Sequence, residues 1–291
     1  MGVPEGKVAI IATVRNALAG YSGSIRESAV AGLVGAVLIT VFELLQVSAP
    51  VLTLFWAMVG CVISAFVYAG LIGLAADGPE DLANRVTKNG ARILGAFAII
   101  AFFLFIVAFV GMLSGMLTLI YSNPAQQGAL RAAGEDQDRV LAVFQAIAQQ
   151  NIGLVVFLGL IGAAVWLVIT SRLYLAVPAT HDLKRIQTFE TWRWTNGNLI
   201  RIIATRVLLL VPLYALIFAI SIGASIVLGL SAPGLPATTT EGLVRGSPAQ
   251  FAVLRVFQMF LMFSIYYALE ARLSVLIYKQ LKPATVRASA N

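Results

Sequence analysis

Six ionisable side chains fall inside or at the edges of strongly apolar segments, and these residues have the best chance of doing chemistry. They are Glu43, Arg172, Arg206, Arg255, Glu270 and Arg272. Because an unpaired charge inside a bilayer is costly, each is a candidate for function or for a structural ion pair. Glu43 and Arg255 fall at similar depth in the first and last apolar segments, so we expect them to pair and join these segments. The alternative is a proton or ion step at Glu43. We also expect Glu270 to pair with Arg206.

Patterns for catalysis and metal binding are weak. The single histidine, His181, precedes Asp182, but adjacent residues on a helix do not face each other. There is no nucleophile elbow. With one histidine and one cysteine, Cys61, the chain has no cluster with the spacing of a zinc or iron site. We therefore expect a protein that is not an enzyme and that needs neither a metal nor another cofactor.

Four arginines lie close together at one end of the fourth and fifth apolar segments, and the guanidinium fork suits bidentate binding of phosphate. These candidates for anionic-lipid binding are Arg172, Arg193, Arg201 and Arg206. The sequence favours a structural role over this lipid site, in which one arginine pairs with Glu270 and the others extend toward the headgroups. We expect Trp192 and Trp194 to anchor the fifth segment at the membrane interface, as aromatic belts do. Either Thr195 or Asn198 is expected to cap the helix that follows.

The elements that must position these residues follow from the composition. Of 291 residues, 59% are hydrophobic and 11% are charged, whereas soluble domains carry about 25% charged residues. A membrane-spanning helix needs about 20 mostly apolar residues. Six segments satisfy this requirement: 28–47, 51–75, 92–121, 152–177, 202–230 and 251–278. The sequence therefore predicts an all-α polytopic membrane protein, with residues 1–291 as a single integral membrane domain.

Three other segments place apolar residues at helical spacing with polar residues on the opposite face. These predicted amphipathic helices cover residues 7–21, 138–150 and 183–194. We expect the first and third to lie at the cytoplasmic interface. The second is expected on the outer surface or packed over the bundle.

An internal repeat links two of the inner segments. Arg85–Phe97 and Arg193–Arg206 both read Arg-x-Thr, then an Asn-Gly turn, then an arginine and an aliphatic run. This similarity predicts three pseudo-repeated helical hairpins, an arrangement that is common in transporters but also follows from simple duplication. The small-residue motif Gly111–Gly115 is expected to pack helices within the chain.

The distribution of lysine and arginine predicts the orientation. With both termini in the cytoplasm, only four of the 20 basic residues fall on the outer side: Arg131, Arg139, Arg245 and Arg255. The net charge of +7 is then mainly a topology signal, and it also suits anionic headgroups. We expect no nucleic-acid partner, because the chain has no compact basic domain. We expect no cleavable signal peptide in Met1–Gly23.

One part of the chain resembles a known family. The positions that carry the resemblance are Arg172, Pro178, Ala179, Trp192, Thr195, Gly197 and Asn198, together with the closing segment Tyr266–Tyr278. They resemble the YciC-like membrane proteins and the related membrane domain of glycerophosphoryl diester phosphodiesterases. The resemblance implies a bacterial inner-membrane protein with six helices and no settled activity. It transfers no catalytic role, because the phosphodiesterase activity of that family belongs to a separate soluble barrel.

The functional prediction is a non-enzymatic inner-membrane protein that interacts with lipids and organises or accompanies a larger membrane complex. Its expected partners are membrane lipids, especially anionic ones, and other proteins or further copies of the chain. The alternative is a transporter or channel for a lipid-like or small substrate. The spans offer few polar residues for a path, and these can hydrogen-bond to their own helix backbones. They are Ser64, Ser114, Thr118, Ser221 and Ser225.

Overall fold

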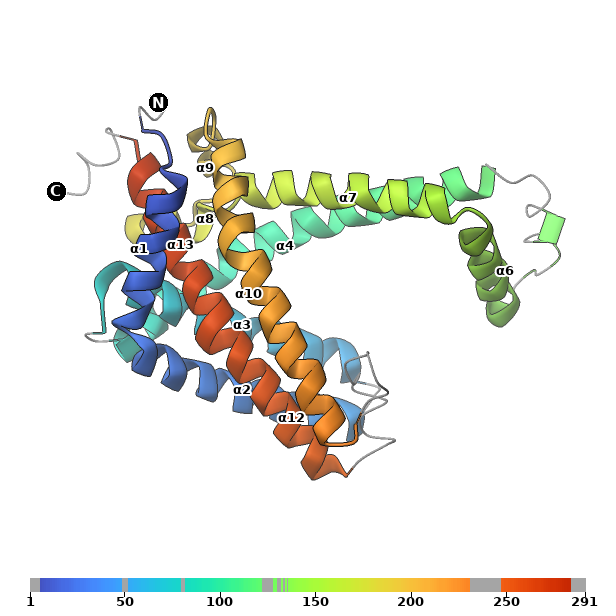
Figure 1. Ribbon diagram of the computed structural model, residues 1–291, viewed down its shortest axis with the longest axis horizontal. Coiled ribbons are helices and arrows are strands. Elements are labelled where there is room, and N and C mark those ends of the chain that lie inside the picture. Colours follow the sequence, from blue (N-terminus) through green and yellow to red (C-terminus); the bar gives the residue numbers. More distant parts are fainter. Residues whose placement is uncertain are drawn as a thin grey trace. The chain divides into compact units, whose positions relative to one another are not determined.

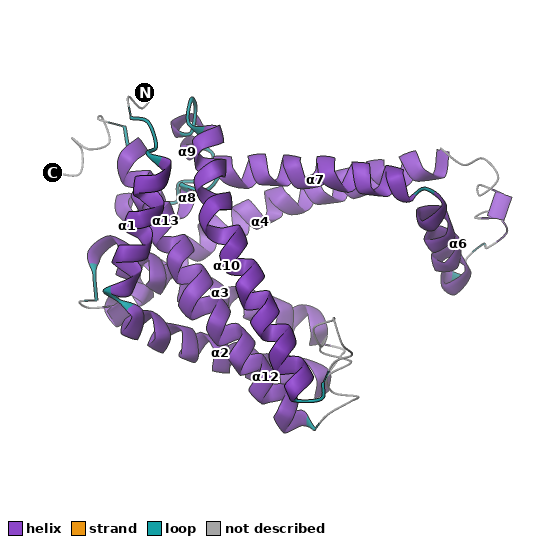
Figure 2. Ribbon diagram, in the orientation of Figure 1, coloured by secondary structure: helices purple, strands orange, loops and turns teal. Residues whose placement is uncertain are grey.

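A computed structural model gives the fold, and it describes residues 6–48, 52–79, 82–121, 128–129, 132, 134, 136–230 and 247–283. In this part of the chain every regular element is a helix (Figure 2). Six helical segments are long and apolar enough to cross a membrane: Ile25–Leu45, Met58–Asp77, Asn89–Tyr121, Ile152–Leu183, Leu199–Val227 and Pro248–Leu281. The predicted all-α fold with six spanning helices is confirmed.

The helices follow one another along the chain from the blue to the red end of the colour scale (Figure 1). They are α1 (Ile10–Ser22), α2 (Ile25–Ser48), α3 (Thr53–Asp77), α4 (Leu82–Tyr121), α6 (Gln137–Gln150), α7 (Ile152–Arg172), α8 (Ala176–Leu183), α9 (Glu190–Trp194), α10 (Leu199–Val227), α12 (Pro248–Leu261), the π-helical turn η2 (Met262–Tyr267) and α13 (Ala268–Leu281). The last span is thus one continuous rod made of α12, η2 and α13.

Helix boundaries follow from local sequence signals. Ser247 and Gln250 form a capping box at the start of α12, where Pro248 occupies the first turn and needs no hydrogen-bond donor. Helix α3 ends at Gly78, whose φ of 89° is a conformation that glycine adopts without a steric penalty. Its N–H donates to the Leu74 carbonyl at 3.2 Å and so satisfies the end of the helix.

The fourth span and the segment after it differ from the prediction. Helix α7 ends at Arg172, and the chain re-forms as the separate helix α8. The predicted amphipathic helix 183–194 is wrong, because Lys184 adopts a left-handed conformation (φ 54°) that ends α8. The loop then folds back on α8: the Gln187 N–H donates to Thr180 Oγ1 at 2.9 Å, and this hydroxyl donates to the Gln187 carbonyl at 3.2 Å. Only α9 is helical in the remainder of the segment.

The other two predicted amphipathic segments are helical. The predicted helix 7–21 corresponds to α1, which begins at Ile10 after a short non-helical stretch. The predicted helix 138–150 corresponds to α6. The proposed repeat depends partly on side chains near Arg85 that lie outside the described part of the chain, as do Arg131 and Arg245. The repeat and the positions of these helices in a membrane stay predictions.

The chain divides into two compact units, Met1–Phe97 with Ser171–Asn291, and Ala98–Thr170. In the first unit, α2 packs against α3 and the last span, while α1 and α10 both pack against α13 (Figure 1). One buried apolar cluster joins α10 and α13 through residues such as Ile202, Leu273 and Ile277. A second joins α3 and α13 through Ile72 and Val275. The end of α13 is therefore enclosed on several sides.

Two helical segments of the first unit approach closely at Gly32 of α2 and Ser264 of η2. A Cβ atom on Gly32 would lie 2.8 Å from both the Cβ and the backbone N of Ser264, which is inside van der Waals contact. From α1, the Tyr21 hydroxyl donates to the Ser264 carbonyl at 3.0 Å. The π-helical turn is thus the point where α1, α2 and the last span meet.

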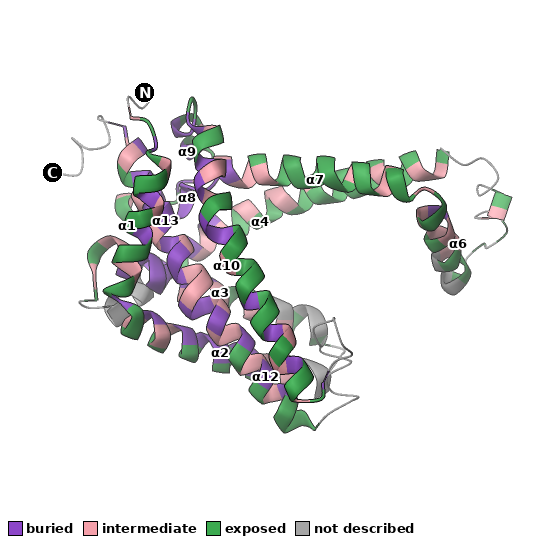
Figure 3. Cartoon of the chain, viewed as in Figure 1, coloured by how far each residue is buried: buried purple, intermediate pink, exposed green. Residues whose placement is uncertain are grey.

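The second unit consists of the C-terminal part of α4, α6 and most of α7, and its apolar side chains are largely uncovered. In the most apolar window of the span Ile152–Leu183, 0% of the residues are buried (Figure 3). A Cβ atom added to Gly111 or Gly115 would meet no atoms within 4 Å in the described part of the chain, so these residues give no support to the predicted packing of this motif. Ser114 and Thr118 hydrogen-bond to carbonyls of their own helix, as the sequence predicted.

Asn198 holds the segment before α1 instead of capping α10. Its Oδ1 accepts from the Val8 N–H at 3.0 Å, and its Nδ2 donates to the Gly6 carbonyl at 3.0 Å. Although Asn198 occupies the N-cap position, its side chain makes no cap hydrogen bond. Arg201 adds a bond from Nη1 to the Val8 carbonyl at 3.1 Å. The expected cap is wrong, because the amide of Asn198 is used to bind a distant segment.

Replacing Asn198 with alanine is expected to release this segment. Losing one partner of a buried hydrogen bond costs about 1–3 kcal/mol, and Val8 is fully buried. We expect the Val8 amide to lose its protection in hydrogen–deuterium exchange. Asn16→Ala, at an exposed position of α1, is the control and should leave exchange at Val8 unchanged. Equal exchange of the Val8 amide in both variants would show that Asn198 does not hold this segment.

Candidate functional site

Glu43 of α2 and Arg255 of α12 lie together. Arg255 Nε donates to Glu43 Oε2 at 2.7 Å, and Nη2 donates to Glu43 Oε1. The third guanidinium nitrogen, Nη1, donates to Gln258 Oε1 at 3.1 Å. Since both carboxylate oxygens accept from the same arginine, the geometry is that of a bidentate structural pair. It supports the role of joining the first and last spans and gives no support to a proton step at Glu43.

Arg172 is bound by the turn that precedes α10. Its Nη1 donates to Asn196 Oδ1 at 2.5 Å and to Thr195 Oγ1 at 3.2 Å, and its guanidinium lies 5.8 Å from the centre of the Trp192 ring. Trp192 is half-buried. Thr195 donates its hydroxyl proton to the Trp192 carbonyl at 2.8 Å and so does not cap α10 either.

Trp194 does not anchor the chain at a membrane interface, and that prediction is wrong. Its side chain is 6% exposed and belongs to the apolar cluster around α13. Its ring lies 6.1 Å from the ring of Tyr278, at 39°. Folding of the short helix α9 against the end of α13 has turned this tryptophan inward.

Arg206 contacts protein groups on two neighbouring segments. Its Nη1 donates to Ser171 Oγ at 2.6 Å, and its guanidinium lies 4.5 Å from the centre of the Tyr174 ring. The expected ion pair between Arg206 and Glu270 stays a prediction. The Glu270 carbonyl accepts from the Tyr174 hydroxyl at 3.1 Å. This polar group therefore ties the fourth, fifth and sixth spans together.

The four arginines nominated for lipid binding do not act as one group. Arg172, Arg201 and Arg206 each donate to protein groups on different segments, whereas Arg193 is exposed. Their guanidinium groups thus serve mainly as links between segments.

A pocket of about 400 Å³ opens where α3, α8 and α13 meet. We call it the lysine pocket, and its lining residues are Ala76, Asp77, Pro178, His181, Asp182, Lys184, Val275, Tyr278, Lys279 and Lys282. All of them belong to the first unit. The pocket brings together basic, acidic and aromatic side chains from three helices, and it is the strongest candidate for a functional site.

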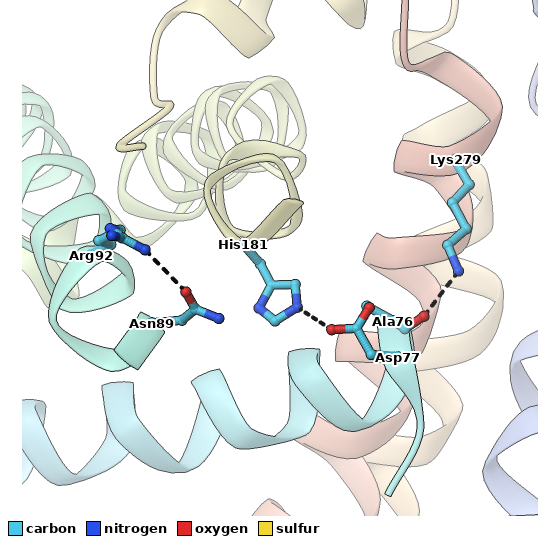
Figure 4. A network of polar contacts seen from close by, with 6 residues as sticks. All are labelled: Ala76, Asp77, Asn89, Arg92, His181 and Lys279. Carbon is cyan, nitrogen blue, oxygen red and sulfur yellow. Dashed lines mark hydrogen bonds and ion pairs between the residues drawn. The ribbon is translucent and has the colours of Figure 1, made fainter. Parts of the chain in front are cut away.

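One wall of the lysine pocket is built by His181. The side chain is 3% exposed, and its Nε2 lies 2.9 Å from Asp77 Oδ2, which joins α8 to the end of α3 (Figure 4). On the other side of the ring, Asn89 points toward His181 and accepts from Arg92 Nη1 at 3.2 Å. The buried ring is thus held by Asp77 of α3, and the Asn89 side chain of α4 points toward it.

The opposite wall is built around Asp182. Its Oδ2 accepts from the Tyr278 hydroxyl at 2.7 Å and from Lys282 Nζ at 2.6 Å. Lys282 also lies 5.9 Å from the centre of the Tyr278 ring. Beside this group, Lys279 Nζ donates to the Ala76 carbonyl at 3.3 Å. Asp182 therefore holds α8 against α13 and fixes the position of one lysine.

The arrangement has the chemistry of a binding site. Three lysines face two carboxylates in the lining, so positive charge is in excess when His181 is neutral. Within the described residues, no group of three or more histidine, cysteine, aspartate and glutamate side chains could hold a metal ion.

Sequence reasoning overlooked the lysine pocket because its contacts join distant positions. His181 and Asp182 are neighbours in the sequence, but their partners Asp77, Tyr278 and Lys282 are 104, 96 and 100 residues away. One local signal was available. Lys279 and Lys282 are three residues apart, a spacing that places two side chains on the same side of a helix end.

The fold and the uncovered apolar faces define the class: the chain is a multi-pass helical membrane protein. No protein-family model matches the chain, and no curated protein or solved structure matches it. The resemblance to the YciC-like proteins therefore stays a prediction that these comparisons do not test.

Proposed function

We propose that this protein is a non-enzymatic, lipid-interacting protein of the bacterial inner membrane that organises or accompanies a larger membrane complex. The observation that carries the proposal is the uncovered apolar surface of the second unit. In the most apolar window of the last span 39% of the residues are buried, against 0% in that of the fourth span. Side chains as large as Phe157 and Leu160 are exposed on α7.

Two kinds of partner fit such a surface. Acyl chains cover apolar side chains without any need for shape matching, since lipid is as apolar as leucine. Small residues add a second possibility, because they allow another helix to approach closely. Among the described residues, no atom of another segment lies within 4 Å of the position that a Cβ would take on Gly153, Gly159 or Gly162 of α7. This combination supports lipid contact together with a protein partner or a further copy of the chain.

The basic residues at one end of the first unit support a cytoplasmic location for that end. There α3 and α13 end and α10 begins, as the contacts of Ala76 with Lys279, of Ala9 with Gln280 and of Val8 with Asn198 indicate. Lys184, Arg193, Arg201, Lys279 and Lys282 belong to this end. Because cytoplasmic loops are enriched in lysine and arginine, we place both termini in the cytoplasm.

Transport of a lipid-like or small substrate remains the alternative function. It would need polar groups available along a path at mid-membrane. Glu43, the residue best suited to an ion step, accepts from Arg255 with both oxygens, and Ser225 donates to the Ser221 carbonyl at 2.8 Å. These contacts favour a structural role for the polar groups of the spans.

Capture of partners from the membrane tests the proposal. The full chain, purified in mild detergent after cross-linking in cells, is expected to retain phospholipid and a stoichiometric partner or second copy. Gly159→Leu should weaken this capture about tenfold, because a loss of about 1.4 kcal/mol of helix packing is a factor of ten. The control Gly60→Leu changes an equally open glycine on α3 and should leave capture intact. A chain that runs alone, without lipid, would contradict the proposal.

A further inference from the structure

We infer that the lysine pocket binds a phosphate group, and that the phosphate is carried by the headgroup of a membrane lipid. The inference rests on the proposed lipid interaction and assigns it a place, a set of residues and a ligand chemistry. It differs from the arginine site expected from the sequence, since it uses the ammonium groups of Lys184, Lys279 and Lys282.

The charges of the lining favour an anion. Asp182 is engaged by the Tyr278 hydroxyl and by Lys282, and Asp77 is in contact with His181. With the carboxylates held in these contacts, the excess positive charge of the three lysines faces the pocket. Lysine ammonium groups bind phosphate as point charges and can do so through several of their N–H donors. A single phosphodiester charge would balance the excess.

The volume and the lining of the lysine pocket suit a lipid headgroup. Its volume of about 400 Å³ is near the lower end of the range of about 300–1,000 Å³ that is typical of small-ligand sites. Part of its lining is apolar and comes from Ala76, Pro178 and Val275. Val275 belongs to the buried cluster that joins α3 and α13. A ligand with a charged phosphate and a short apolar part matches this lining, while its acyl chains would stay in the bilayer.

The backbone at Lys184 keeps one of the cations at the pocket. Its φ of 54° places a lysine in the left-handed region, where a residue with a Cβ atom is strained. Helices that end in this conformation usually have glycine or asparagine there. The hydrogen bonds between Thr180 and Gln187 fix the loop that follows. The fold thus holds this exposed lysine beside the pocket despite the local strain.

Removal of the pocket lysines from the full-length protein tests the inference. We compare the wild type with the triple variant Lys184→Gln, Lys279→Gln, Lys282→Gln and with the single variant Lys184→Glu. The single variant serves as the folding safeguard, because Lys184 is exposed and Lys282 is the residue that pairs with Asp182. The control is Lys7→Gln, Arg15→Gln, Arg26→Gln, which removes the same charge from exposed positions away from the pocket.

Two probes separate the possible sources of the phosphate. Native mass spectrometry measures phosphatidylglycerol retained from vesicles of phosphatidylcholine and phosphatidylglycerol. Calorimetry measures inorganic phosphate and glycerol 3-phosphate. We expect retention of phosphatidylglycerol to fall about tenfold or more in the triple variant and clearly in Lys184→Glu, because each lost charge-assisted contact is among the stronger hydrogen bonds. The control should retain the lipid, and neither soluble probe should displace it.

Each other outcome overturns a defined part of the inference. Tight, lysine-dependent binding of glycerol 3-phosphate without lipid retention would overturn the lipid source. Equal lipid retention in the wild type, the triple variant and Lys184→Glu would overturn the lysine pocket as the binding site. The proposed lipid interaction of the apolar faces would stand. If the wild type retains no lipid at all, both fail. Equal unfolding midpoints of Lys184→Glu and the wild type establish that a loss is one of binding.

Discussion

Replacement of Arg255 with glutamine is expected to destabilise the bundle by about 3 kcal/mol. Removing one partner of a buried ion pair leaves an uncompensated charge, which is the reason for a loss of this size. The Glu43 and Arg255 side chains are 22% and 19% exposed, and the arginine contacts both carboxylate oxygens. The surrounding span is apolar. Among the described residues, no second cation contacts Glu43. The measurement is the unfolding midpoint in detergent.

A double variant distinguishes this pair from a general effect of mutation. Glu43→Gln with Arg255→Gln removes both charges and should recover most of the lost stability, because breaking a buried pair costs more than replacing it. Arg139→Gln is the matched control. Its pair with Asp136 lies on the surface, with side chains 74% and 46% exposed, and such pairs contribute little. A single variant as stable as the wild type, or a double variant less stable than the single, would rule out the pair as a structural link.

Replacement of Gly32 with alanine is expected to destabilise the first unit by about 1–3 kcal/mol or more. The added methyl would lie 2.8 Å from the backbone N of Ser264 and 2.9 Å from its Cα. Backbone atoms cannot turn aside as a long side chain does, so α2 and η2 would have to separate. Thermal unfolding in detergent, followed by circular dichroism, measures the change.

Gly60 provides the comparison for this substitution. It lies inside α3, and among the described residues no atom of another segment lies within 4 Å of the position of an added Cβ. Gly60→Ala should therefore be neutral or stabilise by up to about 1 kcal/mol, since alanine is the better helix former. Similar unfolding midpoints for the Gly32 and Gly60 variants would show that α2 and η2 are not in close contact.

Features that depend on composition or depth could be predicted from the sequence. The six spans follow from apolar length alone, and the approach of Glu43 and Arg255 follows from their depth and opposite sign. Features that depend on which distant segments meet could not. Asn198 looks like a helix cap until Gly6 and Val8 are placed beside it. Trp194 matches an aromatic belt, and only the packing of α9 on α13 shows that it is buried.

The lysine pocket illustrates the same limit for function. None of its residues forms a motif with its sequence neighbours, and the contacts of His181 and Asp182 connect residues about 100 positions apart. The left-handed Lys184 was hidden as well, because the regular spacing of apolar residues after it suggested a continuous helix. Long-range packing determines both the contacts in the lysine pocket and the end of α8 at Lys184.

The π-helical turn Met262–Tyr267 changes the direction in which the side chains of the last span point. Each residue of an α-helix turns the chain by about 100°, and a π-helical turn accommodates an additional residue. The turn therefore rotates the side-chain directions of α13 about the helix axis relative to those of α12. The half before it presents Arg255 to α2, and the half after it presents Tyr278 and Lys282 to α8. Without the additional residue, the side chains after the turn would be rotated by about 100° relative to those before it.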